Sequence, residues 1–154
     1  MTTKSATKSK EKAQKDVIRY ATEQDIPQIM KLYKQMHWAE DDYDPEVLED
    51  PNTHILVFDD KGKIRASAQL TIVHSLARGG RPFGVINYVI TDSGYRRMGY
   101  MKRIFRAFDR ICKKNNCYNS IIVSMWNHAT AHMFYEAAGY TAKVKGFRKN
   151  YPIP

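Results

Sequence analysis

The sequence predicts an α/β domain in which a mixed β-sheet carries helices on both faces. The first observation is size and composition: the chain has 154 residues, of which 43% are hydrophobic and 12% aromatic, and this suits one domain with a single core. The second is the order of short β-forming runs and helical stripes, which is typical of a sheet covered on both faces. The third is a hairpin signal at Asp59–Gly62, between two apolar runs.

The N-terminal half of the predicted domain begins with a short strand at Val17–Tyr20. Thr22 is expected to cap the following helix, because Asp25 stands three residues later as in a capping box. Apolar side chains then recur at helical spacing as far as His37. The segments that follow are a helical turn around residues 45–48, two strands within residues 54–76, and a Gly/Pro loop at residues 77–84.

The C-terminal half begins with a strongly β-forming run, Val85–Thr91, which we expect to be a central strand. From Gly99 the spacing of apolar side chains becomes helical and remains so up to Asn115. A later helix is expected to end with Gly139 at its C′ position. The remaining segments are a buried strand at 120–125, that later helix at 129–138, and a last strand or hairpin at 140–144 and 146–150.

Charge and cysteine content narrow the function classes. The formal net charge is +9, and residues 1–16 supply about +3 of it, because five lysines there face only Glu11 and Asp16. We expect this segment to be a flexible basic tail before a single domain at residues 17–154. The remaining charge favours an anionic ligand such as a nucleotide cofactor, and a nucleic-acid surface fits equally well. Without a membrane span or signal peptide, and with Cys112 and Cys117 read as reduced thiols, the protein is expected to be cytoplasmic.

Residues 85–105 combine a strand, a turn and a helix start in an order that suits a phosphate group. Residues 92–94 form the turn, and the helix begins near Gly99. The first N–H groups of a helix have no partner within it and lie at the positive end of its dipole, so they can hold phosphate oxygens. Arg96 and Arg97 add positive charge, and Gly99 lets the backbone approach a ligand. An ordinary strand–turn–helix with solvated arginines has the same pattern.

A second motif lies on the last predicted helix, where Phe134-Tyr135-Glu136 is followed by Gly139. With Arg96-x-x-Gly99, it resembles the two signatures of the GNAT superfamily of N-acetyltransferases, whose pyrophosphate loop reads Arg/Gln-x-x-Gly-x-Gly/Ala. The resemblance covers residues 18–150 and includes an RGGRP loop before the central strand, as in a group of small bacterial GNAT enzymes. It implies a twisted, mostly antiparallel sheet of the GNAT type.

The resemblance also implies acetyl-CoA as the acetyl donor and the primary amine of a small molecule as the acceptor, without a covalent intermediate. The central strand would pair with the pantetheine through the backbone of Val89 and Thr91. A nearby backbone N–H would stabilise the oxyanion by about 3 kcal/mol. The residues expected at the cofactor are Val89, Ile90, Thr91, Arg96, Arg97, Met98, Gly99, Tyr100, Met101 and Asn127.

Two of these cofactor residues depart from the family pattern. Met101 stands where the family keeps a small residue. Its N–H can still bind phosphate if the flexible side chain turns onto the apolar stripe of the helix, and the alternative is an altered cofactor site. The spacing from Asn127 to Tyr135 is one residue longer than the usual family spacing, and His128 takes the usual place.

The two residues expected to be catalytic are Tyr135 and Asn87. By resemblance, Tyr135 would donate its proton to the departing CoA thiolate, since a phenol with a pKa near 10 suits that role; packing in the core is the alternative. Asn87 replaces the glutamate of several relatives and cannot act as a general base. A water held by Asn87, Tyr88 or backbone carbonyls would then accept the proton of the amine.

The acceptor is expected to contact the segment after the first helix, HWAEDDYD. The residues that we place at the acceptor are Trp38, Asp41 and Asp42 from this segment and Tyr88 from the central strand. Carboxylates attract an ammonium group and aromatic rings stack on it, although a solvated acidic loop would have the same composition. Arg78 and Arg81 favour a different acceptor, one that carries phosphate, as amino-sugar phosphates do.

Other classes of function remain open at this point. An enzyme of this fold acts on proteins in some cases, and the basic tail with the KVKGFRKN segment would suit an approach to nucleic acid. A non-catalytic acyl-CoA-binding module would explain Met101 and Asn87. We expect no bound metal and no membrane partner, and a homodimer is an expectation by analogy with the superfamily.

Overall fold

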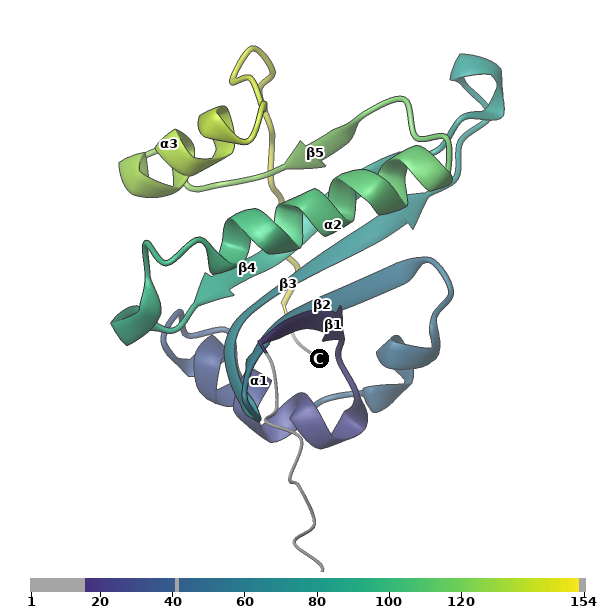
Figure 1. Ribbon diagram of the computed structural model, residues 1–154. Coiled ribbons are helices and arrows are strands. Elements are labelled where there is room, and N and C mark those ends of the chain that lie inside the picture. Colours follow the sequence, from purple (N-terminus) through teal and green to yellow (C-terminus); the bar gives the residue numbers. More distant parts are fainter. Residues whose placement is uncertain (1–15, 41, 153–154) are drawn as a thin grey trace, which may run out of the picture.

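In the computed structural model, residues 16–40 and 42–152 are described, and their strands form one sheet in the order β1-β2-β3-β4-β5 (Figure 1). The strands are β1 Val17–Tyr20, β2 Thr53–Asp60, β3 Lys63–Val73, β4 Phe83–Thr91 and β5 Ser120–Ile122. The α-helices are α1 Ile26–Lys34, α2 Tyr100–Lys114 and α3 Ala129–Ala137. The short 3₁₀ turns are η1 Glu23–Asp25, η2 Pro45–Glu49, η3 Arg78–Gly80 and η4 Ser93–Tyr95.

The sheet is mixed and mostly antiparallel, which confirms the predicted fold class. The first three pairings, from β1 to β4, are antiparallel, and β4 pairs with β5 in parallel. The hairpin predicted at Asp59–Gly62 joins β2 to β3, and its last residue, Gly62, has φ 90°. The turn between them therefore needs a residue without a Cβ at that position.

Successive side chains of each strand point to opposite faces of the sheet, so alternate residues contribute to two separate cores. Helix α2 covers one face, where Phe58, Leu70 and Phe108 belong to the larger cluster of buried apolar side chains. Helix α1 covers the other face and packs Leu32 against Val57 in a smaller cluster. Figure 1 shows α2 running across the sheet close to β3 and β4.

A buried ion-pair network joins the first strand to the start of α1 and to the β2–β3 turn. Arg19 donates to Asp59 (Nε to Oδ2, 3.0 Å) and to Asp25 (Nη1 to Oδ2, 2.6 Å). Asp25 also accepts from the backbone N–H of Thr22 at 2.8 Å, in the predicted capping box. Asp59 accepts from the N–H of Gly62 at 2.6 Å. Both carboxylates are buried and hydrogen-bonded, which is the condition under which buried charge is tolerated.

Two predictions for the C-terminal part are wrong. The strand expected to be buried at residues 120–125 is only Ser120–Ile122, and Val123 and Met125 are exposed, because β5 is paired along one side alone. Residues 140–152 form neither a strand nor a hairpin. Their charged side chains and Gly146 interrupt the apolar alternation that a strand needs. Val144 and Phe147 are accordingly exposed.

Helices within the described residues are too short and too polar to span a membrane. Of the predicted basic tail, residues 1–15 lie outside the described part of the chain, as does Asp41.

Candidate active site

A β-bulge in the centre of β4 forms the middle of the candidate site. Ser67 of β3 pairs with Ile90, whereas Gln69 pairs with Asn87, so Tyr88 and Val89 together oppose a single residue of β3. Tyr88 has φ 52°, a left-handed conformation that is uncommon for a residue with a large side chain. Bulges of this kind leave one residue outside the regular ladder and often lie beside active sites.

Beyond the bulge, β4 has a free edge. It pairs with β5 only over Gly84, Val85 and Ile86, and the described strands then separate, as Figure 1 shows. Asn87, Ile90 and Thr91 of β4 are paired with β3, and none of the described strands lies on the other side of residues 87–91. An unpaired strand edge offers a row of N–H and C=O groups to an extended ligand.

The loop after β4 leads into the N-terminus of α2 a few residues later. Gly99 is the N-cap, has φ 80°, and makes no side-chain cap; the N–H of Arg103 is bonded to its carbonyl at 3.2 Å. The N–H groups of residues 100–102 therefore precede the first bond of the helix and point toward the loop. Apart from its chain neighbours, no atom lies within 4 Å of a Cβ placed on Gly99, so the space beside this N-cap residue is open.

Met101 does not block this opening. Its side chain is buried at 8% exposure in the core under α2, together with Ile104 and Phe105. The inward orientation expected from the apolar stripe is therefore present.

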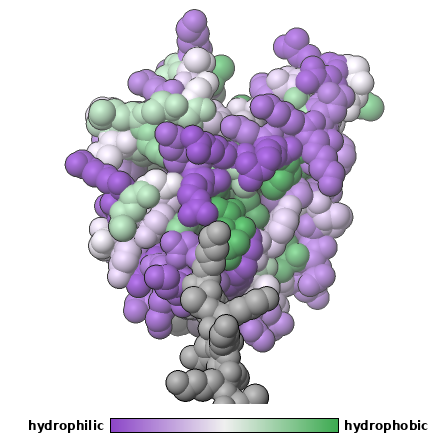
Figure 2. All heavy atoms as spheres, viewed as in Figure 1, coloured by the Kyte–Doolittle hydropathy of each residue, from purple (hydrophilic) through white to green (hydrophobic). Residues whose placement is uncertain are grey.

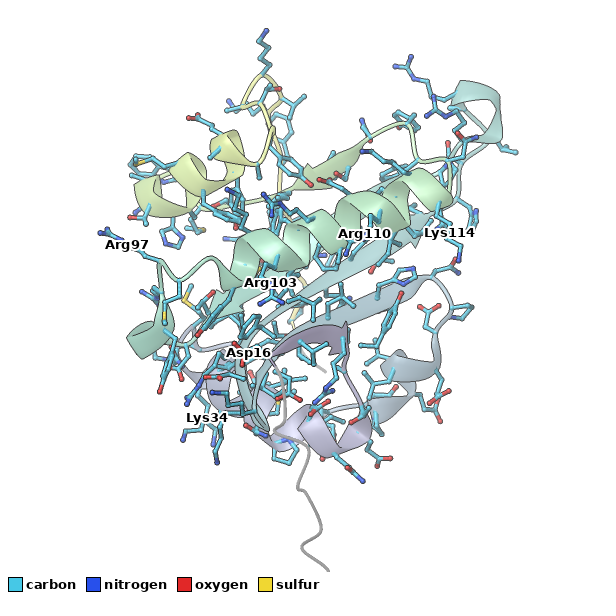
Figure 3. All side chains as sticks on the ribbon, in the orientation of Figure 1. Asp16, Lys34, Arg97, Arg103, Arg110 and Lys114 are labelled. Atoms are coloured by element: carbon cyan, nitrogen blue, oxygen red, sulfur yellow. The ribbon has the colours of Figure 1, made fainter. Side chains whose placement is uncertain are left out.

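Positively charged side chains lie at the N-terminal entrance of α2 and continue along the helix. Arg96 and Arg97 are exposed on the loop, and Arg97 has φ 63°. Arg103, Arg110 and Lys114 lie along the same helix (Figure 3), and Figure 2 shows hydrophilic residues gathered over α2 on this face. Exposed cations at the positive end of a helix dipole are unfavourable unless an anion accompanies them.

Two contacts fix the loop against the sheet. Arg65 of β3 donates to Asp92 at 3.3 Å, and its guanidinium lies 3.7 Å from the centroid of the Tyr95 ring. Gln35, just after α1, accepts from the N–H of Ser93 at 3.1 Å. Contacts from strand β3 and from the residue that follows α1 therefore hold the start of the loop.

Tyr135 reaches the same region from α3. Its ring is stacked on Phe105 at a centroid distance of 6.1 Å, and Phe134 contacts Phe105 edge to face at 5.0 Å. Burial raises the pKa of the Tyr135 phenol, with Tyr140 as a smaller cause. The phenol is therefore protonated at neutral pH, as a proton donor must be.

The two asparagines of the predicted site lie in different settings. Asn87 is paired with Gln69 in the middle of the sheet and is half-buried. Asn127 is exposed in the loop between β5 and α3. That loop is held by His132, whose Nε2 lies 2.8 Å from the carbonyl of Met125. No contact of Asn127 itself connects it to the entrance of α2, so its role stays a prediction.

On the α1 side of the bulge, three aromatic rings form a continuous wall. The ring centroids of Tyr33, Trp38 and Tyr88 lie between 5.6 and 5.9 Å from one another, and both pairs that include Trp38 are edge to face. Burial raises the pKa of Tyr33 to about 12, so this wall carries no negative charge at neutral pH.

Two rings of this wall, Tyr33 and Tyr88, line a cavity of about 150 Å³ between α1, η2 and the sheet, whereas Trp38 packs on these two rings and does not line it. Apolar side chains make most of its surface, and Asp44 and Gln69 add polar groups. Asp44 also caps η2, since its Oδ1 accepts from the N–H of Glu46 at 2.9 Å. The lining residues are Ile26, Ile29, Met30, Tyr33, Tyr43, Asp44, Val47, Leu48, Ile55, Gln69 and Tyr88.

The residues predicted for the acceptor side are divided by this arrangement. Trp38 and Tyr88 are in ring contact, Tyr88 lines the cavity, and neither Trp38 nor the exposed Asp42 does, so their role in acceptor binding stays a prediction. Tyr33 belongs to the helical spacing of apolar side chains in α1, and Asp44 is the last residue of the acidic segment HWAEDDYD. Their positions at the cavity depend on η2 folding over α1, which no local pattern in the sequence indicates.

Arg78 and Arg81 are not part of this site. Arg81 donates to the carbonyls of Asn116 (3.1 Å) and Cys117 (2.9 Å), beyond the C-terminal end of α2. The guanidinium of Arg78 lies 5.6 Å from the ring of Tyr118 in the same area. Both arginines thus fasten the β3–β4 loop to the α2–β5 connection, at the opposite end of α2 from Gly99.

Comparison with known proteins agrees with this geometry. Residues 19–140 match the family described as Acetyltransferase (GNAT) family. A glucosamine 6-phosphate N-acetyltransferase of Trypanosoma brucei brucei is 31% identical over 96 residues, which span 62% of this chain and 63% of that protein. The aligned part therefore covers less than two thirds of this relative.

Solved structures share the fold over nearly the whole chain. A candidate acetyltransferase of Agrobacterium tumefaciens str. C58 superposes with a TM-score of 0.80 at 26% identity, covering 88% of this chain and 99% of that one. The glucosamine-6-phosphate N-acetyltransferase of Arabidopsis thaliana superposes with a TM-score of 0.77 at 21% identity, covering 90% and 99%. The second likeness concerns the fold alone.

Proposed function

The chain belongs to the Acetyltransferase (GNAT) family, and on this premise we propose that it transfers the acetyl group of acetyl-CoA directly to the primary amine of a small molecule. The observation that carries the proposal is the continuity of residues 87–102. They join a free strand edge, a bulge and an uncapped helix N-terminus in one segment. The thioester arm of an acyl-CoA can pair with a free strand edge, and its diphosphate can bind the N–H groups of a helix N-terminus.

The described residues fit such a ligand. The N–H groups of residues 100–102 precede the first hydrogen bond of α2, and the exposed Arg96 and Arg97 are the nearest charges on the loop. A diphosphate would neutralise those charges at the helix N-terminus. Val89 and Thr91 lie on the free edge of β4, where an amide-containing arm can pair as a further strand would.

In this proposal the bound acetyl-CoA supplies an activated thioester, and the chain supplies orientation and protons. The bulge at Tyr88 turns backbone N–H groups out of the ladder, and one donor of this kind contributes about 3 kcal/mol when it is aimed at a developing oxyanion. Tyr135 keeps its proton at neutral pH and donates it to the leaving sulfur. Asn87, paired with Gln69 beside the cavity, holds water that accepts the proton of the amine.

Two measurements test the proposal in sequence. Calorimetry should detect binding of acetyl-CoA and of CoA, and the affinity should fall as salt concentration rises, because Arg96 and Arg97 contribute through charge. An amine panel with detection of the released thiol should then show turnover. Absence of acetyl-CoA binding at low salt would refute the proposal. Binding without turnover on any amine would favour a non-catalytic acyl-CoA-binding module instead.

A second candidate, a protein that acts on nucleic acid, is favoured by the exposed basic row on α2, which includes Arg103, Arg110 and Lys114 (Figure 3). A protein that contacts several phosphates loses affinity steeply as salt rises. Filter binding with duplex DNA and tRNA between 50 and 200 mM salt, roughly the range over which such contacts are lost, decides this candidate.

A further inference from the structure

The cavity beside the aromatic wall restricts what the acceptor can be. We propose that the acceptor is a primary amine carried on a compact apolar body of about the size of one benzene ring, and not a phosphorylated sugar. The inference depends on the proposed acetyl transfer and specifies the substrate class of that same site. It differs from the acceptor that the names of the two glucosamine 6-phosphate relatives would suggest.

The size of the cavity sets the size of the body. Its volume is about 150 Å³, and apolar cavities of roughly 150 Å³ accept benzene. Ile26, Met30 and Leu48 are among the apolar side chains of its wall. A ring or a branched aliphatic group gains the hydrophobic free energy of burial there, whereas each sugar hydroxyl would need a hydrogen-bond partner.

The wall carries no cation that could hold phosphate. Among the described residues that line the cavity, none is Lys or Arg. Arg81, the arginine nearest in sequence to β4, is bonded to the carbonyls of Asn116 and Cys117 and does not reach the cavity lining. A phosphate in this cavity would therefore lie near the carboxylate of Asp44 without a compensating charge.

Aromatic rings and one carboxylate at this site can bind the amino group of the acceptor. The faces of Tyr33, Trp38 and Tyr88 attract a cationic ammonium, and Asp44 supplies one carboxylate on the cavity wall. Tyr88 contributes its ring to this wall and its backbone to the β4 bulge. The amine is thus recognised beside the segment where we place the thioester, with its apolar body directed into the cavity.

The experiment compares phenethylamine, ethylamine, glucosamine and glucosamine 6-phosphate as acceptors at saturating acetyl-CoA. We expect kcat/KM for phenethylamine to exceed that for ethylamine by about tenfold or more, because burial of the ring stabilises the complex. Glucosamine 6-phosphate should be the poorest acceptor. A preference for glucosamine 6-phosphate over phenethylamine would overturn the inference.

Two variants test where the ring of phenethylamine binds: one changes the aromatic wall and the other changes the cavity lining. Trp38→Leu should raise KM for phenethylamine by about 2- to 30-fold through loss of an aromatic face, and KM for acetyl-CoA should stay unchanged. Phe147→Leu, which removes an aromatic ring that is 89% exposed on the C-terminal segment, is the matched control. Val47→Phe, a filling change on η2, should raise KM more for phenethylamine than for ethylamine. Equal effects of Val47→Phe on both amines would contradict the placement of the ring.

A binding measurement separates this inference from the proposed function. The chain has two tryptophans, so Trp126→Phe leaves Trp38 as the only tryptophan. Its fluorescence should change and saturate with phenethylamine in the absence of acetyl-CoA, but not with glucosamine 6-phosphate. Saturation without turnover on any amine would refute acetyl transfer and retain the cavity as an amine site. A Trp38 signal that does not respond to phenethylamine would refute the inference even if other amines are acetylated.

Discussion

The two faces of the sheet differ in how firmly they are packed. Under α2, twelve buried residues form one cluster, whereas five do so under α1. The α2 face holds the elements that we assign to acetyl-CoA, and the α1 face holds the cavity and three partly exposed rings. The donor side is therefore built on the larger buried core. On the acceptor side, fewer buried residues are present, so side chains there can be substituted with a smaller loss of stability.

The largest effect should come from the donor face, at Tyr135. Tyr135→Phe keeps the ring stacked on Phe105 and removes only the hydroxyl, so kcat should fall by about 10²- to 10⁴-fold. The dissociation constant for acetyl-CoA should stay nearly unchanged. Because burial raises the Tyr135 pKa, the alkaline fall in kcat of the wild type should begin above about pH 10. Equal rates in the two proteins would exclude Tyr135 as the acid.

Paired truncations compare the packing of the two faces directly. Phe108→Ala, under α2, should lower the free energy of unfolding by about 3–5 kcal/mol, since Phe108 is 1% exposed. Val47→Ala, at the cavity wall, should cost less than about 1 kcal/mol, because Val47 is 37% exposed. Urea denaturation measures both. Similar losses would show that the acceptor face is as tightly packed as the donor face.

The ion pairs at the edge of α1 should stabilise the acceptor face. Asp25→Asn should lower the free energy of unfolding by about 2–3 kcal/mol. This is somewhat less than the loss caused by breaking a fully buried ion pair, because the Arg19 side chain is 32% exposed. Hydrogen bonds from Arg19, with smaller ones from Thr22, hold the pKa of Asp25 below its ordinary value of 3.8.

This contribution has a defined pH window. Because the folded pKa is depressed, the stabilisation is present above the unfolded pKa of about 3.9 and is lost as the pH falls through the folded value. The stability gap between wild type and Asp25→Asn should therefore narrow below about pH 4. A gap that persists unchanged at pH 2 would mean that Asp25 acts through packing.

A small effect on stability is expected at the helix entrance. Gly99→Ala should cost about 1 kcal/mol of stability, because alanine is strained at φ 80°, although no atom obstructs its Cβ. Gly94→Ala is the matched control: it lies in the same loop, has an equally open position and lacks the left-handed φ, so it should be neutral. Thermal melts and acetyl-CoA titrations of both variants measure the difference.

The sequence was informative wherever local periodicity decides the structure. The apolar stripe from Gly99 predicted α2 and the inward side chain of Met101, and Asp59–Gly62 predicted the hairpin. The bulge at Tyr88 could not be predicted in this way, because it depends on the pairing of β4 with β3 across many residues. The last strand or hairpin predicted at 140–144 and 146–150 does not form, because a few apolar side chains suggested alternation without a neighbouring strand to pair with.

The acceptor cavity was the least predictable part for the same reason. The stripe of α1 assigned Tyr33 to the core, and its ring is indeed half-buried, but one edge meets Trp38 and Tyr88 from two other segments. The wall forms only when the β4 bulge brings Tyr88 to α1, and the cavity forms only when η2 packs beside them. Long-range contacts, and not propensity, determine it.

The left-handed backbone of Tyr88 also constrains how this protein can diverge. Glycine, asparagine and aspartate adopt φ 52° more readily than tyrosine. Relief of conformational strain at residue 88 would therefore remove one aromatic face from the amine site in the same step. Descendants that relax this position are expected to trade affinity for ring-bearing amines for a more stable strand, and those that keep the tyrosine are expected to keep the preference.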